Sequence, residues 1–362
     1  MTSIIAEVGV NHNGDLSMAI DLIAAASDAG ADIVKFQSFR AKDIVTKDVG
    51  KVPYQKASRD GEDTQYGMLS QYELSEEDHH LLMEEARKKG LEFLSTPFCL
   101  AEVALLDRMG VSRFKVSSGD LNNAPLLYEI ASTGRATILS TGMGSLEEVE
   151  RALRVLAFGY ACRDAPSFEA MMTKHSPEEI EAILQDKVVV LHCTTQYPAP
   201  LDSINLRAME SLRDAFALPV GYSDHSEGSL VSVAAVALGA VVIEKHITLD
   251  SKLPGPDHKA SMEPAEFARM VRSIREVETV LGASKKEPTE SEKSIMGIVR
   301  KSLVASRTIK KGELFTKDNL ALKRCASSLA LSPENYWALL DRSASRDYSP
   351  DDAIVEDVDE LG

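Results

Sequence analysis

The chain has 362 residues, and its 56 aspartate and glutamate residues outnumber its 40 lysine and arginine residues, giving a formal net charge of -16 at pH 7. This charge argues against nucleic acid or an anionic membrane surface as the main partner, although a local cluster of lysines can still bind an anionic substrate. No apolar run approaches the roughly 20 residues that span a bilayer, and no signal peptide is expected. Four cysteines without metal-type spacing favour the cytoplasm.

Short apolar runs rich in β-branched residues alternate along the chain with amphipathic helical stretches. Eight such runs cover residues 4–7, 32–37, 92–96, 114–118, 136–141, 188–193, 219–223 and 241–246. The runs are mostly continuous, which is typical of strands covered on both faces in a parallel sheet. Ser145 with Glu148 indicates one helix start, and Ser176 with Glu179 indicates another. In both pairs the side chains can satisfy free backbone N–H groups.

Eight strands alternating with helices predict an α/β fold, the (β/α)₈ TIM barrel, whose usual size is about 250 residues. A doubly wound open sheet is the alternative, but that fold brings strand ends together only at a switch point. Every run here stops at a polar or charged cluster, and active sites of the barrel lie at the carboxyl ends of its strands. The sequence therefore favours the barrel, with its chemistry at that rim.

A change of composition marks the end of the predicted barrel. We expect a barrel domain over residues 1–281, a solvated linker rich in Lys, Glu, Ser and Thr over 282–296, and a small β-rich domain over 297–362. Short strands are predicted in the last domain at 303–305 and 320–324.

Two histidines follow neighbouring predicted strands, the seventh and the eighth. His225 and His246 can face each other across the rim, and two neutral imidazoles can hold a divalent ion that water and substrate also coordinate. Because only two protein ligands are evident, we expect Mn²⁺, or else Mg²⁺ or Co²⁺, rather than a closed zinc site. A structural role for the histidines is the alternative.

Two lysines in apolar strands predict an anion-binding pocket. Lys35 and Lys115 are expected to end the second and fourth strands, where a negative charge would offset the cost of placing them there. Hydroxyl groups that end other strands can donate to the same anion, namely those of Ser118, Ser140 and Ser223. A phosphate fits this set, and ordinary salt bridges at the rim are the alternative. Glu7, which ends the first strand, is either a general acid or base or a partner of Lys35.

Eight ordered motifs resemble the sialic acid synthase family from residue 4 to about residue 348. They are A-E-V-G-V-N-H-N-G from residue 6, V-K-F-Q from 34, S-T-P-F from 95, K-V-S-S-G from 115, L-S-T-G-M from 139, H-C-T-T-Q-Y-P from 192, Y-S-D-H from 222 and P-G-P-D-H-K from 254. The resemblance implies a TIM barrel followed by an antifreeze-like (SAF, β-clip) domain. It also implies condensation of phosphoenolpyruvate with an acylated mannosamine, giving a nine-carbon sialic-type acid and phosphate. The last motif is more similar to N-acetylneuraminate and legionaminate synthases than to pseudaminate synthases.

The resemblance also implies roles for residues at matching positions. Phosphoenolpyruvate is expected to be bound by Lys35, Lys115, Ser118, Ser140, Thr195 and Ser223, and Mn²⁺ by His225 and His246. The expected catalytic residues are Glu7, Gln37, Lys35 and Lys115, with Glu7 and Gln37 acting at C2 of phosphoenolpyruvate. The expected sugar contacts are Glu244, Asp257, Tyr197 and Arg324. Thr195 stands where some members carry asparagine, and Cys325 stands where proline commonly follows the arginine.

In the resembled family the C-terminal domain reaches the partner's barrel, so a domain-swapped homodimer with Arg324 acting in trans is expected. Two other functions stay open at this point. One is a Schiff-base barrel aldolase that uses Lys35 or Lys115 without metal, and the other is a non-catalytic carbohydrate-binding or coat-assembly protein of the same fold. Residues 40–72 are expected to touch the groups that distinguish one sugar from another.

Overall fold

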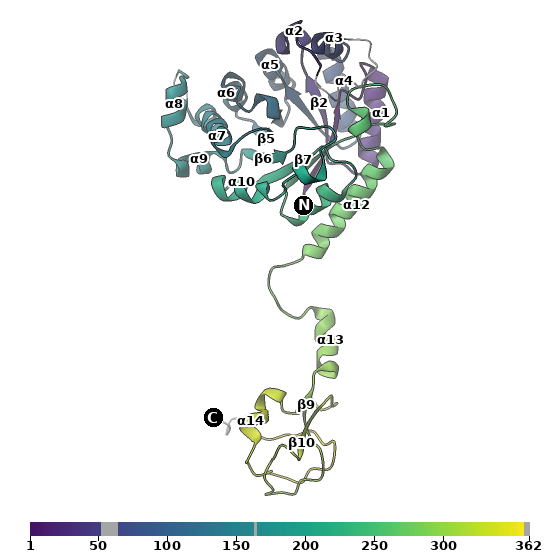
Figure 1. Cartoon of the computed structure of the whole chain (residues 1–362), viewed down its shortest axis with the longest axis vertical. Helices are drawn as coiled ribbons and strands as arrows, with labels where there is room; N and C mark the ends of the chain where they lie inside the picture. The colour runs from purple at the N-terminus through teal and green to yellow at the C-terminus, as the bar shows by residue number, and fades with distance from the viewer. Residues whose placement is uncertain (52–63, 163–164, 358–362) are drawn as a thin grey trace. The chain divides into compact units, whose positions relative to one another are not determined.

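The computed structural model describes residues 1–51, 64–162 and 165–357 (Figure 1). Its contacts divide the chain into two compact units, Met1–Gly282 and Ala283–Gly362. Within the described ranges, no helix is long and apolar enough to cross a membrane. Residues 52–63, in the segment expected to distinguish sugars, and residues 358–362, at the end of the expected C-terminal domain, lie outside the described residues.

The first unit is a near-closed barrel of eight parallel strands, which confirms the predicted fold. The strands are β1 (Ser3–Gly9), β2 (Ile33–Ser38), β3 (Glu92–Pro97), β4 (Arg113–Val116), β5 (Ala136–Ser140), β6 (Val188–Cys193), β7 (Val220–Asp224) and β8 (Val242–His246). They follow one another in the order β3-β2-β1-β8-β7-β6-β5-β4, and the ends of this order, β3 and β4, lie side by side. Each strand therefore directs its carboxyl end to the same rim.

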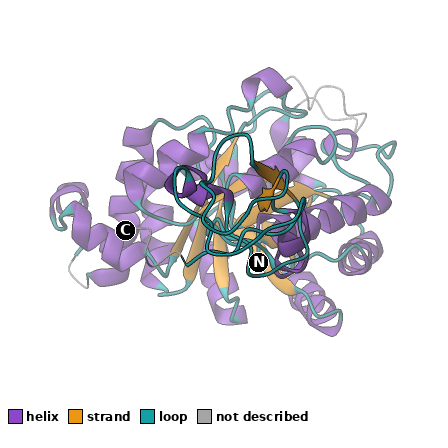
Figure 2. Ribbon diagram, turned by 90° about the horizontal axis from the view of Figure 1, so that it is seen from below, coloured by secondary structure: helices purple, strands orange, loops and turns teal. Residues whose placement is uncertain are grey.

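Helices surround the strands (Figures 1 and 2). In this unit they are α1 (Leu16–Asp28), α2 (Ala41–Ile44), α3 (Gln65–Ser70), α4 (Glu76–Lys88), α5 (Leu100–Met109), α6 (Ala124–Ser132), α7 (Leu146–Ala161), α8 (Phe168–Thr173), α9 (Pro177–Leu184), α10 (Ala208–Phe216), α11 (Leu230–Ala237) and α12 (Pro264–Leu281). The main core, which includes Phe36, Phe114 and Phe158, lies between these helices and the strands. The strands can be continuously apolar because both of their faces are covered.

Local signals start the helices where the sequence predicts. Glu148 N donates to Ser145 Oγ at the start of α7, and the Glu148 side chain accepts from Ser145 N. Ser176 and Glu179 make the same reciprocal bonds at the start of α9. These bonds satisfy N–H groups that have no partner within the helix, so both predicted starts are confirmed.

An apolar cluster fills the inside of the barrel. It consists of Ile5, Ile33, Leu94, Ile138, Leu191 and Val242. Side chains two positions apart on a strand point the same way, so the next inward-facing layer begins two residues further along each strand. That layer contains Glu7, Lys35, Thr96, Ser140, Cys193 and Glu244. The inward-facing side chains therefore change from apolar to polar or charged over two residues of each strand.

The second unit has a small core of its own. Helix α13 (Glu290–Val299) precedes the antiparallel pair β9 (Ser302–Ala305) and β10 (Leu320–Lys323), and α14 (Tyr336–Leu339) follows. The core includes Leu303, Phe315 and Tyr348. Helix α13 falls largely within the segment expected to be linker. It forms because Thr289 and Glu292 make reciprocal capping bonds, and its residues stay largely exposed.

Gly221 in β7 leaves no room for a side chain. A Cβ there would lie 2.5 Å from the Val242 carbonyl oxygen and 2.6 Å from Leu191 Cδ2. Since strand β8 would have to move, we expect Gly221→Ala to lower the free energy of unfolding by ~1–3 kcal/mol, measured by thermal unfolding of the full chain. Gly50→Ala is the control, because a Cβ at Gly50 meets nothing within 4 Å. Equal losses in the two variants would contradict this expectation.

Candidate active site

A cavity of about 600 Å³ lies at the carboxyl ends of the strands. Most of the residues that the sequence predicts for the site line it, namely Glu7, Lys35, Gln37, Lys115, Ser118, Ser140, Thr195, Tyr197, Ser223, His225, Glu244 and His246. Asp257, after β8, lies next to this cavity, with its Oδ2 3.9 Å from His246 Nδ1. Arg324 is an exposed residue of the second unit. The barrel thus brings its predicted site residues together.

Lys35 lies inside β2 and Glu7 lies inside β1 rather than at the strand ends, so both predicted strand positions are wrong. Strand β2 continues three residues beyond Lys35, to Ser38, and β1 continues two residues beyond Glu7, to Gly9. Lys35 Nζ is 2.8 Å from Glu7 Oε2 and 3.5 Å from Glu244 Oε2. It also donates to Thr96 Oγ1 at 3.2 Å. The ammonium group can be buried here because two carboxylates offset its charge.

Lys115 shares the Glu244 carboxylate with Lys35. Its Nζ lies 3.6 Å from Glu244 Oε1 and donates to Ser140 Oγ at 2.7 Å. Ser223 Oγ also donates to Glu244 Oε1, at 2.9 Å. Glu244 is therefore the negative group between the two lysines, and the ion pairs that the sequence left as an alternative are present.

Burial and neighbouring charges change the proton affinities of these four groups. Burial raises the pKa of Glu7 against the effect of Lys35. Burial also acts to raise the pKa of Glu244, but Lys115 and Lys35 outweigh it and lower that pKa to about 2. Burial lowers the pKa of Lys115, whereas for Lys35 burial is outweighed by Glu244 and Glu7, which raise its pKa. Uptake of a proton by Glu7, which its raised pKa favours, would leave the two lysines facing one carboxylate and would favour an anion.

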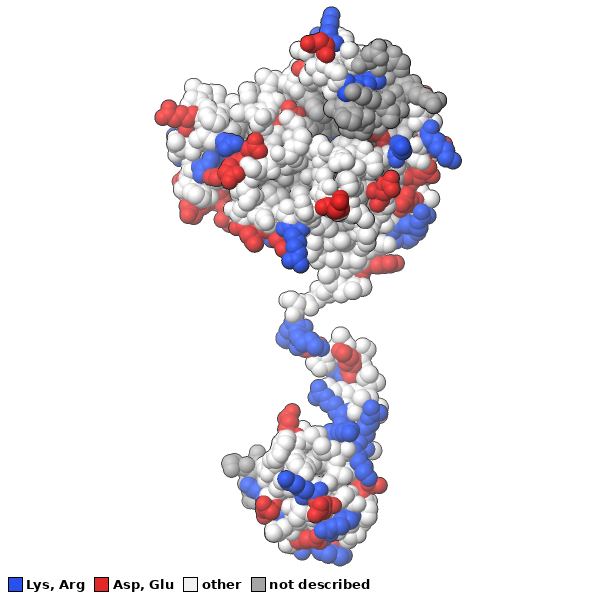
Figure 3. All heavy atoms as spheres, viewed as in Figure 1, with Lys and Arg blue, Asp and Glu red and all other residues white. Residues whose placement is uncertain are grey.

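The two lysines of the site lie inside the cavity rather than on the surface. On the face of the barrel unit drawn in Figure 3, acidic and basic side chains are interspersed. Lys35 and Lys115, in contrast, are each only 3% exposed. An anionic substrate is therefore attracted by groups inside the cavity rather than by that face.

A second polar cluster surrounds Gly142. Gly142 N donates to Ser118 Oγ at 3.0 Å, and Ser118 Oγ lies 3.1 Å from Cys193 Sγ. A Cβ on Gly142 would be 2.3 Å from Thr195 Oγ1 and 2.6 Å from Cys193 Sγ, so only glycine lets these groups converge. The Thr195 hydroxyl therefore lies in the cluster. Sequence reasoning missed the part played by Thr96, although this residue belongs to the S-T-P-F motif.

The rings of His225 and His246 lie close together, with centroids 5.6 Å apart. Tyr197 contacts both, at centroid distances of 4.1 Å and 5.7 Å. His225 Nδ1 lies 2.8 Å from Thr194 O, which assigns the Nδ1 proton to that bond and leaves Nε2 with a lone pair. These contacts fix the orientation of the His225 ring.

The two imidazoles fit a divalent cation. Burial lowers the pKa of His225 to about 4 and that of His246 well below its usual value, so both rings are neutral near pH 7. His246 Nδ1 is buried and has no hydrogen-bond partner among the described residues. The described ranges contain no group of three or more His, Cys, Asp or Glu able to hold a metal, so other ligands would have to complete its coordination.

The loop that carries Asp257 is attached to the loop after β1. His258 Nδ1 lies 2.7 Å from Thr248 Oγ1, and His258 Nε2 lies 3.1 Å from Asn13 Oδ1. Burial, with a contribution from Glu7, raises the pKa of Asp257 to about 7. This carboxyl group can therefore donate or accept a proton near neutral pH.

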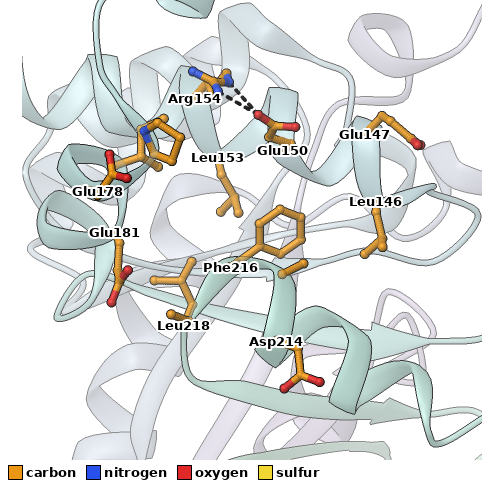
Figure 4. A pocket seen from close by; sticks show the side chains of 14 residues that line it. Leu146, Glu147, Glu150, Leu153, Arg154, Glu178, Glu181, Asp214, Phe216 and Leu218 are labelled. Carbon is orange, nitrogen blue, oxygen red and sulfur yellow. Dashed lines mark hydrogen bonds and ion pairs between the residues drawn. The ribbon is translucent and has the colours of Figure 1, made fainter.

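Another cavity, of about 520 Å³, lies between α7, α9 and α10 on the flank of the barrel (Figure 4). Its lining combines apolar side chains such as Leu153 and Phe216 with carboxylates, and Arg154 pairs with Glu150 at 2.7 Å. The residues that the sequence predicts for the site line the cavity at the strand ends instead. The predicted site residues therefore gather at the strand ends and not on this flank.

Known proteins match both units of the chain. Residues 22–286 match the NeuB family, and residues 300–357 match the SAF domain. An N,N'-diacetyllegionaminic acid synthase of Campylobacter jejuni is 45% identical over 98% of this chain and 99% of that protein. A protein of the same name from Legionella pneumophila is 46% identical over 91% of this chain and 87% of that protein. The crystal structure of an N-acetylneuraminic acid (sialic acid) synthetase from Leptospira borgpetersenii in complex with citrate has a TM-score of 0.67 and 32% identity, covering 82% of this chain and 90% of that chain.

His258 makes the stability of this rim dependent on pH. Burial lowers its pKa to about 4, below the value of about 6.5 expected in the unfolded chain. The unfolded state therefore binds more protons between these values, so this contribution to stability is complete above about pH 6.5 and is lost as pH falls toward 4. We expect His258→Gln to lose less stability than the wild type between about pH 7 and pH 5, measured by thermal unfolding.

The exposed His80 supplies the control for this measurement. The His80→Gln variant should keep the pH dependence of the wild type. If His258→Gln and the wild type lose stability equally over this range, burial of the His258 ring is not the cause.

Proposed function

Because the chain belongs to the NeuB family, as its sialic acid synthase motifs indicated, we propose that it condenses phosphoenolpyruvate with an acylated mannosamine. The products are a nine-carbon sialic-type acid and phosphate. The observation that carries this proposal is that two buried lysines and two neutral imidazoles line one cavity. The two relatives of about the same length favour the diacetylated 6-deoxy sugar that leads to N,N'-diacetyllegionaminic acid.

We assign phosphoenolpyruvate to the lysine side of the cavity. Its binding groups are Lys35, Lys115, Ser118, Ser140, Thr195 and Ser223. Lys115 is held by Ser140, and Ser118 is held by Gly142 N, so these donors are already ordered. Little reorganisation is needed when the anion binds, and preordered donors also stabilise charge that develops during the reaction.

The sugar is assigned to the histidine side. His225 and His246 would hold Mn²⁺, which supplies positive charge that polarises the aldehyde oxygen of the open-chain sugar. Tyr197 packs against both imidazoles and keeps their orientation. Glu244 and Asp257 would accept hydrogen bonds from sugar hydroxyl groups.

In the reaction, the π electrons of the C2–C3 bond of phosphoenolpyruvate form the bond from C3 to the aldehyde carbon, whose C=O π bond breaks and whose oxygen gains a proton. Water adds to the positive C2 and loses a proton. The tetrahedral centre then releases phosphate by C–O cleavage, and the proton of the C2 hydroxyl group passes to the departing phosphate as the ketone forms. Glu7 accepts a hydrogen bond from Gln37 Nε2 at 3.1 Å and pairs with Lys35. Its raised pKa suits a proton carrier, and its ionised form can stabilise positive charge at C2.

A Schiff-base aldolase is the competing function, since burial lowers the pKa of Lys115. Both lysines are engaged by carboxylates, which favours their use as fixed cations. Borohydride trapping with pyruvate separates the two functions, because only the aldolase forms a covalent adduct on Lys35 or Lys115. A non-catalytic carbohydrate-binding protein would bind sugar without turnover.

Phosphate release from phosphoenolpyruvate tests the proposal. The full chain is offered a panel of acylated hexosamines, and the acid formed is identified by mass spectrometry. We expect release with the diacetylated 6-deoxy sugar in preference to N-acetylmannosamine. Thorough chelation should abolish release and added Mn²⁺ should restore it, and activity that survives chelation would reject the metal assignment.

A lysine variant provides the matched test within the site. Lys115→Met should lower kcat/KM by about 10²–10³-fold, as expected for loss of a preordered charged donor. Lys88→Met is the control, because Lys88 is an exposed residue of α4 that pairs only with residues of the same helix in the described structure. Similar activity of the two variants would remove Lys115 from the mechanism.

We further propose a domain-swapped homodimer in which Arg324 contacts the acyl group of the sugar in the partner's barrel. We also place the enzyme in the cytoplasm, in keeping with its four free cysteines.

Co-expression of Arg324→Ala and His246→Ala chains tests the domain swap, since each chain alone should have little activity. If the arginine acts in trans, random pairing should restore about a quarter of wild-type sites, because half of the dimers carry one complete site. No recovery in the mixture would place Arg324 in cis or outside the site.

A further inference from the structure

A buried ion pair joins β7 and β8 on the side of the barrel wall opposite the cavity. Asp224 and Lys245 are register partners in the two parallel strands, and each directly precedes one of the two histidines. Lys245 Nζ lies 3.0 Å from Asp224 Oδ2, and neither side chain is more than 1% exposed. Because Glu244 and His246 face the cavity, the alternation of the strand directs Lys245 to the outer face.

The Asp224 carboxylate is fully used by its neighbours. Its Oδ1 accepts from Ser226 N at 2.8 Å and from Ser226 Oγ at 2.6 Å. Its Oδ2 accepts from Ser232 Oγ of α11 at 2.6 Å in addition to the contact with Lys245. Four contacts match the acceptor capacity of a carboxylate, so Asp224 is held by strand, loop and helix together.

Lys245 contacts the residues on both sides of His225. Its Nζ pairs with Asp224 and also donates to the carbonyl oxygen of Ser226 at 2.5 Å. The residues on both sides of His225 are therefore bound to the residue that precedes His246. One buried group thus links the backbone positions of the two imidazoles.

Burial of such a pair needs a reason beyond stability. Removing two charges from water is costly, and a buried pair of this kind often adds little to stability compared with apolar packing. The pair lies where apolar side chains fill most of the space between strands and helices. In some proteins a buried polar pair instead fixes one arrangement of the elements that it joins.

We propose that Asp224 and Lys245 are positioning residues that fix the spacing of the His225 and His246 imidazoles and so set the affinity of the site for a divalent cation. This inference rests on the proposed function. Neither residue touches the substrate or the cation. Groups that orient metal ligands from behind typically alter metal affinity by about 10–100-fold when they are changed.

Calorimetric titration of the metal-free full chain with Mn²⁺ tests this inference. Asp224→Asn keeps the shape of the side chain and removes its charge, and we expect its Kd for Mn²⁺ to be about 10–100-fold weaker. The control is Arg113→Met. It removes an ion pair with Glu92 at the amino ends of β3 and β4, away from the cavity at the carboxyl ends. Its Kd should stay within about 2-fold of wild type even if its melting temperature falls, because the site is distant.

Two further variants keep the test decisive if Asp224→Asn does not fold. Ser232→Ala removes only the bond from α11 and should weaken Mn²⁺ binding by a smaller factor, and Asp224→Asn with Lys245→Met leaves no unpaired charge. The KM for phosphoenolpyruvate should change little in all three, since its assigned ligands lie on other strands or face the cavity.

Wild-type Mn²⁺ affinity in every folded variant overturns this inference alone, provided that the wild type releases phosphate. A wild-type chain that binds no Mn²⁺ and releases no phosphate overturns both this inference and the proposed function.

Discussion

The shared carboxylate of Glu244 is the constraint on which the interior of this barrel depends. Two ammonium groups, those of Lys35 and Lys115, lie on either side of it, and each is almost completely buried. A buried charge is tolerated only when it is paired and hydrogen-bonded. Glu244 meets this need for both lysines at once, and Glu7 supplies a second partner for Lys35. The barrel can therefore keep two cations in a cavity open to an anionic substrate without unfolding around them.

The layers of side chains inside the barrel follow from the two-residue alternation of side chains along a β-strand. An apolar layer fills the barrel, and the residues two positions further along the strands form the charged layer above it. The two histidines come at or just beyond the ends of β7 and β8, at the rim itself. The two lysines thus share one layer with Glu7 and Glu244, whereas His225 and His246 lie two residues beyond Ser223 and Glu244 on β7 and β8.

Local polar contacts hold the histidine side in the same way that ion pairs hold the lysine side. Thr194 O orients the His225 ring, Tyr197 packs on both rings, and the pair Asp224 and Lys245 binds the backbone behind them. The loop after β8 is attached to the loop after β1 through His258. The rim is therefore held by polar groups whose partners come from distant parts of the chain.

The sequence by itself determined the barrel, the helix starts at Ser145 and Ser176, and the types of residue at the strand ends, because these follow from local periodicity, capping and composition. The family motifs added an expected role for each of these residues. The sequence did not determine that Lys35 lies within its strand, that Glu244 lies between the lysines, or that Asp224 and Lys245 form an ion pair on the outer side of the strands that carry the histidines. The capping pair of α13 was a local signal, but the polar composition around it masked the helix. Contacts between residues far apart in the chain depend on strand register and barrel closure, and only the tertiary structure decides these.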